Sequence, residues 1–123
     1  DKCGALVSYC VSQLTGVQID HDNEHECLSS ILRHKSIGSD VHHGPVYLVD
    51  SSEVAELHGR MDFDQEAVEA LFEDTSAFPM MCGALCDITK ERDMEYAVCH
   101  VMRFKAMMNL AVDRGCGLLV HFF

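Results

Sequence analysis

The sequence predicts a small α/β fold, in which a sheet of about three strands is covered by helices; an α+β arrangement is the alternative. Residues 46–49 and 117–123 are short runs that are apolar nearly throughout, as in strands buried on both faces. A less regular apolar run at 78–88 is a third candidate strand. Helical patterns lie between these runs, and strands that alternate with helices indicate successive crossover units.

One globular domain, residues 1–123, is expected from the length of the chain. About two-thirds of the unfolded surface would be buried on folding, which supplies a core without a disulfide or a metal. Hydrophobic residues make up 48% of the chain, and it has only 8 glycines and 2 prolines. This composition excludes a disordered or low-complexity chain.

Two helices are predicted before the first strand. Residues 5–14 fit a helix or a strand, and the helix is favoured, with Gly16 as its C-cap or a turn. Asp20 or Asp22 caps a second helix that runs to about Lys35, because acidic residues fill its first turn and basic residues its last. Residues 36–45 are expected to form a loop.

Three further helices follow the strand at 46–49. Ser51 or Ser52 caps a short helix, and Asp64 caps the next one. Thr89 caps the longest helix, over about 90–113, which Gly115 ends. The core positions expected of these helices are Val54, Leu57, Met61, Val68, Leu71, Phe72, Met94, Ala97, Val98, Val101, Phe104, Met108 and Ala111.

The charge of the chain is strongly negative and unevenly placed. Nine Lys and Arg stand against 20 Asp and Glu, a net charge of −11, which excludes binding to a nucleic-acid backbone or an anionic membrane surface. Residues 50–74 hold nine acids and one base, whereas residues 87–114 are balanced. The acidic helices either form a solvated face or bind a protein with a basic surface, through Glu53, Glu56, Glu66 and Glu69.

Seven cysteines are present, an odd number that cannot pair completely within the chain. Their spacing is irregular, and several lie in apolar runs. Free cysteines that fill core space indicate a reducing, intracellular and cytoplasmic setting. No stretch reaches the length of about 18 apolar residues that a membrane span needs.

A zinc site is the alternative to a chain without a cofactor. His21 and His25 are four residues apart, which on a helix places both imidazoles on one face. A zinc site needs a further protein ligand, which His42 or His43 could supply. The competing interpretation is an exposed helix start that happens to contain histidines. Calcium is excluded, because His25 stands where an EF-hand loop needs glycine.

Catalytic signatures are absent from the sequence. It has no Gly-x-Ser-x-Gly elbow, phosphate-binding loop or dinucleotide fingerprint. Cys99 and His100 are adjacent, so their side chains diverge by about 100° on a helix and cannot act as nucleophile and base. Four methionines lie on the long helix, and Met102 and Met107 fall partly off its core stripe, which suits an adaptable binding face or an additional layer of core.

The sequence therefore predicts a small regulatory or interaction protein without catalysis. Its partner would bind the acidic helices at 50–74 or the methionine-bearing helix at 90–113. The alternative is an enzyme of hydrolase or transferase type that uses a histidine or cysteine with a carboxylate, or a bound zinc.

Overall fold

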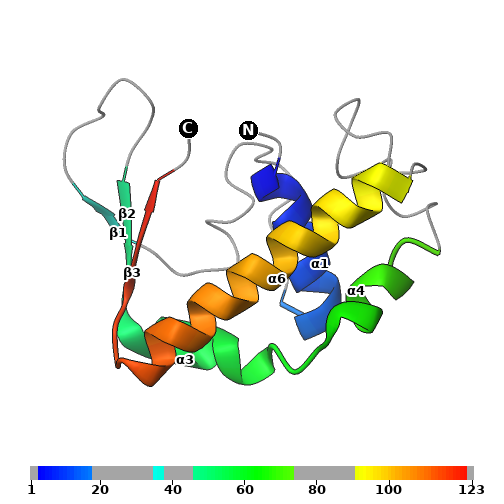
Figure 1. Cartoon of the computed structure of the whole chain (residues 1–123). Coiled ribbons are helices and arrows are strands. Elements are labelled where there is room, and N and C mark those ends of the chain that lie inside the picture. Colours follow the sequence, from blue (N-terminus) through cyan, green and yellow to red (C-terminus); the bar gives the residue numbers. More distant parts are fainter. Residues whose placement is uncertain (1–2, 18–34, 38–45, 74–90, 122–123) are drawn as a thin grey trace.

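A computed structural model describes residues 3–17, 35–37, 46–73 and 91–121. The elements in chain order are α1 (Cys3–Thr15), β1 (Lys35–Ile37), β2 (Val46–Val49), α3 (Ser51–Arg60), α4 (Gln65–Ala70), α6 (Glu91–Asp113) and β3 (Leu118–His121). The long helix α6 lies at the centre and packs against α1, α3 and α4 (Figure 1). The three strands form a small sheet beside the helices (Figure 1). The expected mixture of helix and sheet is confirmed.

The sheet has the strand order β1-β2-β3, and both pairs of neighbours are antiparallel. In the second pair, Tyr47 lies opposite Val120 and Leu48 lies opposite Leu119. The expectation that β2 and β3 belong to crossover units is wrong, because such units make parallel pairs. The helices between β2 and β3 return the chain in the opposite direction.

Burial of the sheet on both faces is also contradicted. Tyr47 and Val49 are buried, whereas Leu48 is 37% exposed and its partner Leu119 is 68% exposed. Successive side chains of a strand point to opposite faces, and cross-strand partners share a face. The sheet therefore buries the face of Tyr47 and Val49 and leaves its other face open at the two leucines.

Helix α1 confirms the helical interpretation of the first segment. All seven residues from 6 to 12 are buried, which explains why the sequence carries no clean amphipathic stripe there. The helix ends at Gly16, whose φ is +74° and whose N–H donates to the carbonyl of Ser12 at 2.9 Å. This is the left-handed cap that glycine favours. The Ser12 hydroxyl donates to the Val17 carbonyl at 2.5 Å.

The two short helices differ in how they begin. The expectation that Ser51 or Ser52 caps α3 is wrong, because α3 begins at Ser51 and Asp50 occupies the N-cap position without a side-chain cap bond. The cap of α4 is confirmed: Asp64 Oδ1 accepts the N–H of Ala67 at 2.9 Å. The core positions expected of α3 and α4 are buried, except Leu71, which is half-buried.

Helix α6 closely matches its predicted range. Ala97, Val101 and Met108 are fully buried. At its end the N–H of Gly115 donates to Val112 and that of Cys116 donates to Ala111, with Gly115 at a φ of +65°. These two bonds make a Schellman cap.

Several other expectations concern residues 18–34, 38–45 and 74–90, which lie outside the described residues. They include the helix from Asp20 or Asp22, the strand at 78–88 and the cap at Thr89. Residues 35–37 form β1, so the expected helix end at Lys35 and the loop at 36–37 are wrong. Within the described part of the chain, no helix combines the length and the apolar character needed to cross a bilayer.

The close approach of β3 to β2 leads to a prediction about glycine. A Cβ added at Gly117 would lie 2.3 Å from the Val49 carbonyl oxygen. Gly117→Ala should therefore lower the free energy of unfolding by about 1–3 kcal/mol. Gly59→Ala is the matched control, because a Cβ there meets nothing within 4 Å in α3 and should stabilise the helix by up to about 1 kcal/mol. Urea unfolding followed by circular dichroism measures both; equal stabilities would contradict the predicted close contact.

Candidate functional site

The acidic surface is formed by carboxylates on and around α3 and α4. Between residues 50 and 73 the structure describes eight acidic side chains and one basic side chain, Arg60. All eight acidic side chains are exposed or half-buried. They are Asp50, Glu53, Glu56, Asp62, Asp64, Glu66, Glu69 and Glu73, and Asp74 lies outside the described residues.

Packing of the apolar residues turns these carboxylates outward. Val54 and Leu57 of α3 and Val68 of α4 are buried, and both helices pack against α6. Glu66 and Glu69 are three residues apart within α4, so they share one side of that helix. Figure 1 shows α3 and α4 following one another along the same side of α6.

The predicted binding residues are all on this surface, but their exposure differs. Glu56 and Glu66 are exposed, whereas Glu53 and Glu69 are half-buried. The carboxylate Oε1 of Glu69 accepts a hydrogen bond from Gln65 Nε2 at 2.7 Å. Glu56 and Glu66 are therefore the more accessible of the four.

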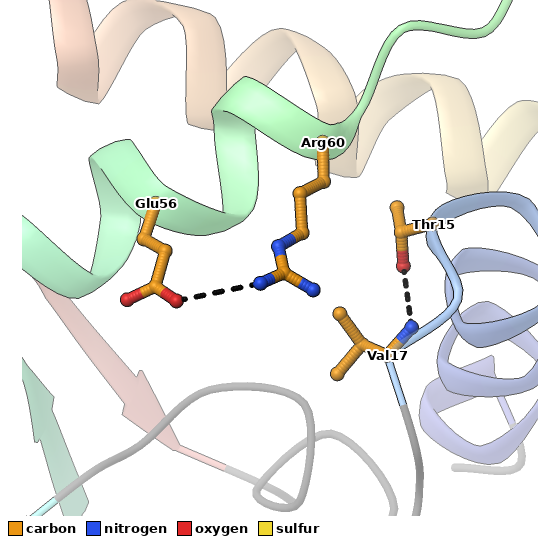
Figure 2. Close-up of polar contacts among 4 residues, drawn as sticks. All are labelled: Thr15, Val17, Glu56 and Arg60. Carbon is orange, nitrogen blue, oxygen red and sulfur yellow. Dashed lines mark hydrogen bonds and ion pairs between the residues drawn. The ribbon is translucent and has the colours of Figure 1, made fainter.

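The only base in this segment is already engaged. Arg60 Nη2 lies 3.7 Å from Glu56 Oε1, one helical turn away (Figure 2). Both side chains are about half exposed, so water weakens their attraction. This ion pair offsets one of the eight carboxylates and leaves a marked negative excess.

Lys105, a base on neighbouring α6, is held by an apolar residue. Its Nζ donates a hydrogen bond to the Phe63 carbonyl and lies 5.0 Å from the centre of the Phe63 ring. The second contact is a cation–π interaction. Lys105 therefore ties α6 to the connection between α3 and α4.

Two histidines of the described residues make specific contacts. His58 of α3 hydrogen-bonds through Nε2 to Asn109 Oδ1 of α6 at 2.6 Å. The ring of His100 lies 4.3 Å from the ring of Tyr96, one turn earlier. His100 thus packs along the helix toward Tyr96, whereas Cys99 is exposed.

The predicted zinc ligands His21, His25, His42 and His43 lie outside the described residues. Their convergence on a metal stays a prediction. Within the ranges that the structure describes, no three side chains of His, Cys, Asp or Glu come together as a possible metal site.

The expectation that cysteines fill the core holds for one residue and fails for two. Cys10 is fully buried in α1, whereas Cys99 and Cys116 are exposed, and all three are free thiols. Cys99 lies on the side of α6 away from the buried positions, and Cys116 follows the turn at Gly115. The apolar residues next to these cysteines in the sequence did not predict their exposure, because burial depends on which face of a helix a residue occupies.

The methionines of α6 also divide between core and surface. Met108 is fully buried, Met94 and Met102 are half-buried, and Met107 is exposed. Two other exposed apolar side chains, Tyr96 and Leu110, share the outer side of α6. Tyr96 and Leu110 were not among the predicted binding residues, although their positions opposite the core stripe are a sequence signal of exposure.

Comparison with protein-family models, curated proteins and solved structures found no match to this chain.

The cap of α4 gives a prediction for the stability of the acidic surface. Asp64→Ala removes the bond to the Ala67 N–H and should lower the free energy of unfolding by about 1 kcal/mol. Asp62→Ala is the matched control, because Asp62 is exposed two residues earlier and lies outside the cap. Thermal unfolding compares the two variants. A similar loss of stability in both variants would show that removal of a negative charge, rather than loss of the cap, causes the destabilisation.

Proposed function

We propose that this chain is an interaction domain without catalysis that binds a basic surface of a protein partner. The observation that supports the proposal is the acidic surface itself: eight carboxylates on and around two consecutive helices, all at least partly exposed, with one base among them. That base, Arg60, is paired with Glu56. The acidic surface therefore keeps a net negative charge that attracts a basic partner.

The physical role of such a surface is to attract and orient. A concentrated negative field raises the rate of encounter with a cationic protein and disfavours anionic competitors. The helices that carry it are supported by buried Val54, Leu57 and Val68. A partner would therefore meet carboxylates on a packed scaffold, which reduces the entropy lost on binding.

The exposed thiols of Cys99 and Cys116 support placing this function in a reducing compartment, where free cysteines persist. The methionine-bearing helix α6 is a less direct candidate for the same partner. Three of its methionines are buried or half-buried, and its outer side carries arginines rather than acids.

Neutralising the acidic surface should weaken binding to a cationic probe. The probe is a synthetic lysine-rich peptide with a fluorescent label, and anisotropy gives its dissociation constant. Glu56→Gln with Glu66→Gln should raise that constant roughly tenfold at low salt, since each lost charge contact contributes up to about 1 kcal/mol. Adding Glu53→Gln and Glu69→Gln should raise it further.

The matched control removes two charges elsewhere. Glu95→Gln with Asp113→Asn also removes two negative charges, but from α6, and should change the dissociation constant of the peptide much less. Wild-type binding should also weaken as ionic strength rises from about 0.01 M to about 1 M, because the Debye length falls from about 30 Å to about 3 Å. Equal effects of the two double variants would contradict a localised acidic site.

Elemental analysis of the full chain, purified without added metal, tests the enzyme alternative. Stoichiometric zinc that is lost on His21→Ala and His25→Ala would favour that alternative over the interaction domain.

A further inference from the structure

The outer side of α6 carries a second surface of opposite charge. It consists of Tyr96, Arg103, Met107, Leu110 and Arg114, and is called here the α6 outer stripe. Tyr96, Met107 and Leu110 are 44%, 42% and 52% exposed, and both arginines are exposed. Scattered exposed apolar residues need no explanation, but these three share a line with two bases.

Helical geometry places the stripe opposite the core. At about 100° per residue, the five side chains fall within an arc of about 60°, on the side of the helix away from Ala97, Val101 and Met108. Among the α6 residues whose exposure the structure describes, the exposed acids are Glu95 and Asp113, and both project about 90° from the centre of that arc. The stripe is thus cationic and apolar, although the whole chain has a net charge of −11.

Contacts among the described residues leave both arginines of the stripe available to a partner. Among the described residues, no ion pair joins Arg103 or Arg114 to a carboxylate. Tyr96 packs against His100, which places a second aromatic ring beside the stripe. Two bases beside solvent-exposed apolar side chains are complementary to a ligand that is apolar on one face and acidic at its edges.

We infer that the α6 outer stripe binds an acidic amphipathic helix of a partner protein. From Tyr96 to Arg114 the stripe extends over 19 residues, or about 27 Å at a rise of 1.5 Å per residue, which matches a partner helix of about five turns. Its apolar face would cover Met107 and Leu110, and its carboxylates would pair with Arg103 and Arg114. Helix-in-groove and helix-on-helix recognition use anchors at these spacings.

A second copy of the chain fits the stripe less well. Antiparallel pairing of two α6 helices about their middle would place Arg103 opposite itself. Like charges in that position repel each other, and both copies carry the same net charge of −11. An acidic helix avoids the repulsion between arginines.

The stripe is independent of the acidic surface. Helix α3 meets α6 through His58 and Asn109, and Asn109 projects roughly 130° from the centre of the stripe. The two surfaces have opposite charge and select different partners. Loss of binding at one therefore leaves the other testable.

The test uses the full chain and two labelled synthetic peptides of about 20 residues with the same leucine face. One peptide carries glutamates beside that face, and the other carries lysines. The acidic peptide should bind, and Met107→Ala with Leu110→Ala should weaken it roughly tenfold or more, as expected for central apolar anchors. Arg103→Gln should weaken it several-fold and reduce the dependence on salt.

Matched control variants show whether weaker binding is specific to the stripe or follows from the loss of any exposed leucine or base. Leu119→Ala truncates an exposed leucine on the sheet, and Arg60→Gln removes a base from the acidic surface; both should leave binding of the acidic peptide within about twofold of wild type. Circular dichroism verifies that each variant is folded. Because the stripe is exposed, its variants are expected to fold as the wild type does.

Three results would overturn the inference. The first is failure of the acidic peptide to bind the wild-type chain. The second is stripe variants that bind it as tightly as wild type. The third is a dimer in sedimentation velocity that Leu110→Ala abolishes, which would show that a second copy covers the stripe. Binding of the lysine peptide alone, sensitive to Glu56→Gln and Glu66→Gln, would uphold the acidic surface while rejecting the stripe.

Discussion

Burial of one side of α6 is the constraint on which the described structure depends. Ala97, Val101 and Met108 are removed from water where α1, α3 and α4 pack against this helix. Apolar burial is the main favourable term in folding. His58 to Asn109 and Lys105 to Phe63 add polar links at the edge of the same packing. These links hold α3 and the start of α4 on one side of α6.

The same packing separates the outward chemistry into two surfaces. Once Val54, Leu57 and Val68 face inward, the carboxylates of α3 and α4 lie at the surface, where all of them are at least partly exposed. Once the core stripe of α6 is buried, Tyr96, Met107 and Leu110 project outward with two arginines. Charge is thus segregated around α6, although no single segment of the sequence contains both surfaces. That segregation is the basis for proposing two partners of opposite character.

Local signals of the chain predicted a large part of the fold. Most core positions of α3, α4 and α6, the cap at Asp64 and the end at Gly115 follow from helical periodicity and backbone geometry, which act within a few residues. Leu71, Met94 and Phe104 were also predicted as core and are half-buried. The expectations that failed involve distant neighbours. The general expectation that cysteines fill the core fails at Cys99 and Cys116. Leu48 and Leu119 were expected to be buried because they lie in continuous apolar runs, and both are exposed. In each case, the exposed face depends on which elements pack nearby.

Residue type and short spacing were enough to predict the described helices α1, α3, α4 and α6, most of their buried residues and the excess of acid at 50–74. The antiparallel pairing of β2 with β3, the two exposed leucines on one sheet face and the apolar, basic side of α6 became evident only from the packing of the folded chain. Strand pairing and side-chain exposure arise from contacts between segments as far apart as Leu48 and Leu119. Composition and local periodicity do not show which distant segments of the chain will come into contact.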